Sequence, residues 1–174
     1  DIFSSLKRSI DRRRRDWAIA TDRADQEPRM SRLRVAVIGS GLIANVKHIP
    51  AWQRLKDQAD LTSLCDLDLQ QAQRVARKFG IPNVYRDLDD LFGTERPDVV
   101  DICTPPKTHC FIAEAAMSAG CHVMIEKPMA ITIEECDRII AVARQNNVKV
   151  CCGHSDLFYH AYTEGRRMVA DGRI

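Results

Sequence analysis

Short apolar segments alternate with helical segments along this chain from residue 33 onward, and this alternation limits its fold more than any other feature. Leu33–Ile38 reads LRVAVI, the kind of run found in strands that are buried on both faces. Gly39 ends the run. A helical stretch follows from about Gly41 to Leu55, and Pro50 is expected to kink or interrupt it because proline lacks a main-chain N–H group.

The rest of the chain carries the same two signals in turn. Further strands are predicted at Leu61–Cys65, Val84–Tyr85, Asp98–Thr104, His122–Ile125 and Val148–Cys152. Further helices are predicted at Asp68–Phe79, Leu88–Phe92, Thr108–Ala119, Ile133–Gln145 and Tyr162–Asp171. Their expected N-caps are Asp68, Asp87, Thr108 and Thr132, and their expected C-terminal glycines are Gly80 and Gly120. This order predicts an α/β fold with one doubly wound parallel sheet.

The turn after the first strand has the spacing of a phosphate-binding loop. Residues 35–44 read VAVIGSGLIA, which contains G-x-G-x-x-A between a predicted strand and a predicted helix. Gly39 permits the tight turn, Gly41 lets the main chain approach a pyrophosphate, and Ala44 lets the helix pack closely on the strand. Because a helix N-terminus attracts anions, the predicted dinucleotide contacts are Gly39, Ser40, Gly41, Leu42 and Ile43. Taken alone, the pattern also fits an ordinary strand–turn–helix.

A carboxylate at the end of the second predicted strand supports dinucleotide binding. Asp66 stands where such an acid accepts hydrogen bonds from the adenosine ribose hydroxyls. Its charge would repel a 2′-phosphate, so NAD is favoured over NADP. The strand, the glycine turn and the acid together predict a Rossmann fold with NAD as its cofactor.

Two more polar segments stand where predicted strands end. The segment from Thr104 to His109 follows the fourth strand, and Glu126–Lys127–Pro128 follows the fifth. In a doubly wound sheet, the loops at the carboxyl ends of the strands line the ligand crevice. Each segment also has a simpler explanation, since the first could be a strand stopped by two prolines and Lys127 could be a solvated side chain.

Taken in order, these motifs resemble those of the glucose–fructose oxidoreductase, inositol dehydrogenase and MocA family. The resemblance covers about residues 33–173 and includes DICTPPKTH, AGCHVMIEKPMA and VCCGHSDLFYHAY. It implies NAD- or NADP-dependent oxidation or reduction of sugars, cyclitols and related small molecules. It also implies an N-terminal Rossmann domain, followed by an α/β domain whose open sheet covers the substrate and often mediates oligomerisation.

The same resemblance implies roles for residues at two strand ends. The lysine of E-K-P lies near the nicotinamide and the substrate in this family, so Lys127 is the catalytic candidate and a predicted cofactor contact. Glu126 is expected to help orient the ribose, and the nicotinamide ribose is expected to contact Thr104, Pro105 and His109. An ammonium group there could stabilise alkoxide charge on the substrate as hydride leaves.

The segment after the last predicted strand departs from the family pattern. An Asn and an Arg-Phe or Phe-x-Pro stretch are usual there, whereas this chain has HSDLFYH at 154–160. His154 is expected either to contact the nicotinamide or substrate, or to be a polar residue at a domain junction. His48, on the first helix, is expected to be structural. The Asp and His that the family usually places in its second domain cannot be assigned.

Charge, apolar run length and cysteine spacing argue against nucleic-acid binding, a membrane span and a metal site. The chain has 26 basic and 24 acidic residues, and the surplus of two lies within residues 1–29, so the remainder offers no basic field for nucleic acid. No apolar run approaches the roughly 18 residues that span a bilayer. The seven cysteines have no C-x-x-C spacing, and Cys151 and Cys152 would point to opposite faces of a strand. We therefore expect no metal site and a reducing cytoplasm.

The predicted organisation is a polar basic extension at 1–30, an NAD(P)-binding domain at 31–153, and the start of a truncated substrate domain at 154–174. Three hypotheses remain open. The chain is part of an NAD-dependent dehydrogenase acting on a sugar-like or polyol substrate, homo-oligomeric when complete; or it is an NAD-binding module without chemistry; or it is an inactive fragment of such an enzyme. The lysine at position 127 favours an enzyme.

Overall fold

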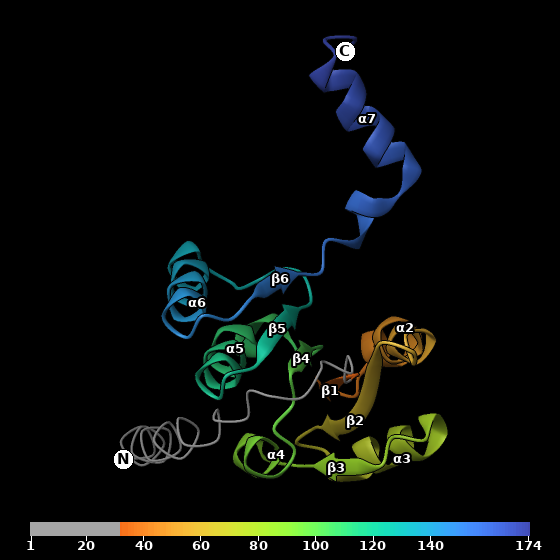
Figure 1. Ribbon diagram of the computed structural model, residues 1–174, viewed down its shortest axis with the longest axis vertical. Helices are drawn as coiled ribbons and strands as arrows, with labels where there is room; N and C mark the ends of the chain where they lie inside the picture. The colour runs from red at the N-terminus through yellow and green to blue at the C-terminus, as the bar shows by residue number, and fades with distance from the viewer. Residues whose placement is uncertain (1–31) are drawn as a thin grey trace, which may run out of the picture.

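A computed structural model describes residues 32–174, so the extension predicted at 1–30 lies outside the described residues. Its centre is a six-stranded sheet in the order β3-β2-β1-β4-β5-β6 (Figure 1). Neighbouring strands pair in parallel throughout this sheet. The predicted doubly wound α/β fold is confirmed.

The elements lie close to where the sequence pattern predicts them. The strands are β1 (Leu33–Ile38), β2 (Ala59–Cys65), β3 (Asn83–Tyr85), β4 (Val99–Ile102), β5 (His122–Ile125) and β6 (Val150–Cys152). The helices are α2 (Ile49–Arg54), α3 (Leu69–Phe79), α4 (Leu88–Thr94), α5 (His109–Ser118), α6 (Ile133–Gln145) and α7 (His160–Ala170). Short turns are η1 (Ala44–His48), η2 (Pro106–Thr108) and η3 (Ser155–Phe158).

The sheet separates two apolar clusters, because successive side chains of a strand point to opposite faces. On β1, Val37 packs with the cluster that includes Ile49 of α2 and Ala72 of α3. Its neighbours Ala36 and Ile38 pack with the other cluster, which contains buried residues of α4, α5 and α6. Helices therefore cover both faces of the sheet (Figure 1), which explains why the strands are apolar on both sides.

The helix after the glycine turn is interrupted, as Pro50 predicts. The first part, η1, has π-helical geometry, and Pro50 stands in the first turn of α2. At that position its missing N–H group costs no hydrogen bond within α2. The interruption places the side chain of His48 at the junction of the two parts.

All four predicted N-caps stand at N-cap positions, but only two of them make a side-chain capping bond. Asp68 accepts a hydrogen bond from the main-chain N–H of α3, and Thr132 does the same for α6. Asp87 and Thr108 stand at N-cap positions but accept no capping bond. The hydroxyl of Thr108 bonds instead to the Thr104 hydroxyl and to the Pro105 carbonyl, both at 2.8 Å, so it stabilises the loop that precedes the helix.

The last helix stands apart from the sheet. Figure 1 shows α7 extending away from the other elements, and none of its residues is buried. Large apolar side chains are exposed in α7 and in the residues just before it, among them Phe158, Tyr159, Tyr162 and Val169. Within residues 32–174, no helix is long and apolar enough to cross a membrane.

Candidate functional site

The carboxyl ends of the central strands form one row. Ile38, Ile102 and Ile125 are register partners at the ends of β1, β4 and β5. The next residues continue the ladder, since the N–H of Cys103 donates to Ile38 and the N–H of Glu126 donates to Ile102, at 2.8 and 2.9 Å. Parallel pairing therefore brings the glycine turn, the T-P-P segment and the E-K-P segment to the same edge of the sheet.

The glycine turn has the geometry that its sequence predicts. Gly39 has φ = +97°, a conformation that favours glycine. A Cβ on Gly41 would meet no described heavy atom within 4 Å, so its main chain faces open space. The following residue, Leu42, is largely exposed. A pyrophosphate could approach the main chain here, which is the role predicted for this turn.

Asp66 holds the turn as well as facing the crevice. Its Oδ2 accepts hydrogen bonds from the main-chain N–H and the hydroxyl of Ser40, both at 2.7 Å. Its Oδ1 accepts from the N–H of Asp68 at 2.9 Å. Ser40 is buried, and its hydroxyl also accepts from Gln71 at 3.1 Å. This second role of Asp66 could not be predicted from the spacing alone.

A cavity of about 910 Å³ extends from the turn to the amino ends of the strands, where Leu33, Asp98 and His122 line it, and it brings several predicted contacts together. Its lining includes Gly39, Gly41, Asp66, Thr104 and Pro105. A volume of this size is within the range of ligand sites. The lining does not include Ser40, Leu42 and Ile43 of the turn, nor His109, Glu126 and Lys127.

His109 joins two of the loops. Its imidazole is fully buried, with Nε2 2.8 Å from the Thr104 carbonyl and Nδ1 2.9 Å from the Pro128 carbonyl. The side chain thus links the T-P-P segment to the E-K-P segment. We therefore expect His109 to influence a cofactor through the positions of these loops.

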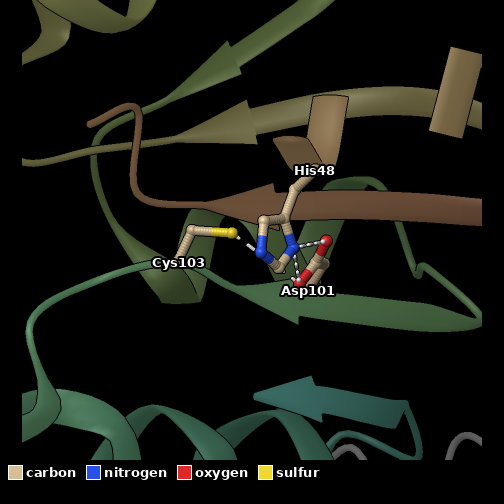
Figure 2. Close-up of side chains that lie close together, drawn as sticks. All are labelled: His48, Asp101 and Cys103. Atoms are coloured by element: carbon tan, nitrogen blue, oxygen red, sulfur yellow. Dashed lines mark hydrogen bonds and ion pairs between the residues drawn. The ribbon is translucent and has the colours of Figure 1, made fainter. Parts of the chain in front are cut away.

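A buried polar network that the sequence analysis missed lies beneath the E-K-P segment. Nδ1 of His48 lies 2.9 Å from Oδ2 of Asp101 (Figure 2). The side chain of Asp101 is fully buried. The indole N–H of Trp52 donates to the same oxygen at 2.7 Å. The thiol of Cys103 lies 3.7 Å from Oδ1 of Asp101. The available signals were an aspartate inside an apolar strand, and a His and a Trp one helical turn apart.

The network continues to the candidate catalytic lysine. Nε2 of His48 lies 3.2 Å from Oε1 of Glu126, and Oε2 of Glu126 accepts the main-chain N–H of Lys127 at 2.7 Å. Burial lowers the pKa of His48, but hydrogen bonds and charge from Asp101, with a smaller contribution from Glu126, outweigh it, so the pKa lies above 6.5. His48 is buried, as a structural histidine would be, yet it also contacts the site.

The same network contains three side chains of the types that bind metal ions, those of His48, Asp101 and Cys103. Their possible ligand atoms lie within 4.8 Å of one another. Their polar atoms already satisfy each other, because Asp101 accepts from His48, Trp52 and the Cys103 thiol. Burial, and then the charge of Asp101, raise the pKa of that thiol, whereas a metal ligand must be a thiolate. We therefore assign no metal ion to this cluster.

Comparison with known proteins agrees with this geometry. Residues 33–154 match the family model described as "Oxidoreductase family, NAD-binding Rossmann fold". The chain is 38% identical over 115 residues to D-glucoside 3-dehydrogenase of Escherichia coli (strain K12), a match that covers 66% of this chain and 32% of that protein.

Two solved structures share the fold. The crystal structure of myo-inositol 2-dehydrogenase from Lactobacillus plantarum has a TM-score of 0.75 and 26% identity, covering 83% of this chain and 42% of that one. Scyllo-inositol dehydrogenase from Lactobacillus casei, solved with bound NAD(H) and scyllo-inositol, has a TM-score of 0.75, 25% identity and the same coverage.

The chain spans less than half the length of its relatives. The match covers 32% of the length of the glucoside dehydrogenase and 44% of the length of another curated relative. The match to the family model nevertheless covers most of the chain, and it includes the glycine turn, Asp66 and the E-K-P segment. On these grounds, the chain belongs to the Gfo/Idh/MocA family of oxidoreductases and carries its NAD-binding Rossmann domain.

Proposed function

We propose that this chain is the cofactor-binding half of an NAD-dependent dehydrogenase acting on a sugar, cyclitol or related small molecule. The observation that carries the proposal is the row of strand ends, which places Lys127 at the same sheet edge as the glycine turn and Asp66. A pure binding site would need the turn and the acid but not the lysine. The names of relatives, a glucoside dehydrogenase and inositol dehydrogenases, support this substrate class.

We further propose that the site prefers NAD to NADP. Asp66 lines the cavity beside the turn, and its carboxylate would accept hydrogen bonds from the ribose hydroxyls but repel a 2′-phosphate. Its bonds to Ser40 keep that carboxylate at the mouth of the turn. A relative with bound NAD(H) supports the same cofactor.

In this proposal, the residues of the chain divide into binding and chemical groups. Gly39, Ser40, Gly41, Leu42 and Ile43 would hold the pyrophosphate, Asp66 the adenosine ribose, and Thr104 and Pro105 the nicotinamide end. A bound nicotinamide supplies a hydride acceptor or donor. The Lys127 ammonium would donate a hydrogen bond to the substrate oxygen and stabilise its negative charge as the C–H bond breaks.

The domain boundaries remain part of the proposal. We place the cofactor domain at 31–153 and the start of a substrate domain at 154–174, because η3 and α7 bury no residue and expose several apolar side chains. The complete protein would be a homo-oligomer in a reducing cytoplasm, which suits its seven free thiols. Alone, this chain would bind cofactor without turnover, because hydride transfer needs an enclosed pocket.

Calorimetric titration of the 174-residue chain with NAD and with NADP tests the core of the proposal. We expect saturable binding of NAD and weaker binding of NADP. Absence of binding by either cofactor would overturn the proposed function. Tighter binding of NADP would overturn only the preference assigned to Asp66.

A further inference from the structure

We propose that His48 is a positioning residue for Lys127, acting through Glu126. The inference rests on the proposed dehydrogenase function and deepens it, because it adds a residue from the first helical segment to the site. His48 and Glu126 are 78 residues apart in the chain, yet their side chains meet beneath the strand ends.

The imidazole of His48 lies between two carboxylates. His48 has 6% of its side chain exposed, Asp101 has none, and Glu126 has 13%. Nδ1 faces both carboxylate oxygens of Asp101, at 2.9 and 3.1 Å, and Nε2 faces Glu126 at 3.2 Å. The ring is therefore held at both nitrogens by carboxylates from neighbouring strands, Asp101 within β4 and Glu126 directly after β5.

Two carboxylate partners favour the protonated form of this imidazole. A neutral imidazole has one N–H group, whereas an imidazolium has two and can donate to Asp101 and Glu126 together. Its positive charge also compensates two carboxylates that are almost completely removed from water. The remaining neighbours of Asp101 are neutral donors, the Trp52 indole and the Cys103 thiol. The cluster is thus arranged around a cationic His48.

Glu126 connects His48 to the lysine. With Oε1 held by His48, Oε2 of Glu126 is directed at the main-chain N–H of Lys127, 2.7 Å away. Pro128, on the other side of the lysine, is held by His109 through its carbonyl at 2.9 Å. Lys127 therefore stands between two anchored residues, and releasing either anchor changes where its ammonium group lies.

Nitrogen NMR of the wild-type chain tests the protonation without any substitution. We expect both ring nitrogens of His48 to carry protons at about pH 7, where an unperturbed histidine is mostly neutral. We also expect slow hydrogen exchange at the amide of Lys127. A neutral ring with one unprotonated nitrogen would overturn the proposal. Because this NMR measurement needs no cofactor, its result remains valid even if the chain does not bind NAD.

A matched pair of variants tests the positioning. In His48→Asn the amide nitrogen takes the place of Nδ1 and keeps a donor for Asp101 but cannot reach Glu126. In His48→Gln it takes the place of Nε2 and can still donate to Glu126. We expect exchange at the Lys127 amide to accelerate in the Asn variant and to stay slow in the Gln variant.

In the complete enzyme, the Asn variant should lose up to about 100-fold in kcat, as expected of a displaced catalytic group, with KM for NAD unchanged. The Gln variant should recover most of that loss. Equal losses in both variants, or an unchanged Lys127 amide in the Asn variant, would overturn the proposal. If the wild-type enzyme turns over no substrate, the proposed function fails. The exchange rate of the Lys127 amide in the two variants then still tests whether His48 positions Lys127. If the Asn variant does not fold, the wild-type NMR result decides.

Discussion

Gly39 lies directly against the main chain of Cys103, because a Cβ at position 39 would be 2.8 Å from both the carbonyl carbon and the carbonyl oxygen of Cys103. The two residues follow the paired ends of β1 and β4. From this pair, β2 and β3 continue the sheet on one side, and β5 and β6 continue it on the other. The first glycine of the turn is therefore required by the packing of the protein itself. Gly41 has no such neighbour within the described part of the chain, so we attribute its requirement to the proposed cofactor.

The two glycines should consequently respond differently to the same substitution. Gly39→Ala should destabilise the fold by about 1–3 kcal/mol from its positive φ alone, and by more because of the contact with Cys103. Gly41→Ala should leave the free energy of unfolding nearly unchanged but weaken NAD binding. Urea denaturation and calorimetric titration of both variants separate these effects. A stable Gly39→Ala variant, or undiminished NAD binding by Gly41→Ala, would contradict this assignment.

Removing the charge of Asp66 should alter the choice of cofactor. In Asp66→Asn the repulsion of a 2′-phosphate disappears, so we expect NAD to bind more weakly and the preference over NADP to narrow. Asp68→Asn is the matched control, because this residue caps α3 and Asn caps a helix as well as Asp does. Titration of both variants with both cofactors provides the measurement. An unchanged ratio of NAD to NADP affinity in Asp66→Asn would remove this residue from cofactor selection.

The lysine of the E-K-P segment should matter for turnover and not for cofactor affinity. In the complete enzyme, Lys127→Ala removes the proposed donor to the substrate oxygen, and kcat should fall by roughly 100- to 1,000-fold. NAD binding should stay close to that of the wild type. Lys149→Ala is a suitable control, because Lys149 is exposed and precedes β6 at the opposite edge of the sheet. Full activity of Lys127→Ala would exclude the lysine from the mechanism.

The sheet and the glycine turn could be predicted because their causes are local. A strand buried on both faces must be apolar throughout, as LRVAVI is, and a main chain with positive φ at the turn favours glycine. The position of Asp66 could also be predicted, since it follows a recognisable strand.

The network around His48 depends on causes that are not local. Asp101 interrupts an otherwise apolar strand, and its partner His48 is 53 residues away on a helical segment. Periodicity shows that each residue belongs to an element, but not which faces of two elements meet. Likewise, the bond between Asp66 and Ser40 became evident only once β1 and β2 were paired. Contacts that depend on tertiary packing are thus the part of this site that spacing could not predict.

The elevated pKa of His48 also predicts how stability depends on pH. Burial lowers this pKa, but Asp101 and Glu126 raise it by more, so the folded value lies above the ordinary 6.5. Its contribution to stability is then complete below about pH 6.5 and is lost as pH rises through the folded pKa. Burial raises the pKa of the Cys65 and Cys121 thiols to about 12, and their effect begins only above the ordinary thiol value of 9.0.

Urea denaturation between about pH 6 and pH 8.5 therefore isolates the histidine contribution. We expect the free energy of unfolding of the wild-type chain to decrease with rising pH over this interval. The decrease should be smaller in His48→Asn, which has no imidazole to titrate there. His154→Asn is the control and should retain the wild-type slope, because His154 is exposed and lies outside the buried network. A slope that persists unchanged in His48→Asn would mean that another group governs the pH dependence and that His48 is not bound as a cation between Asp101 and Glu126.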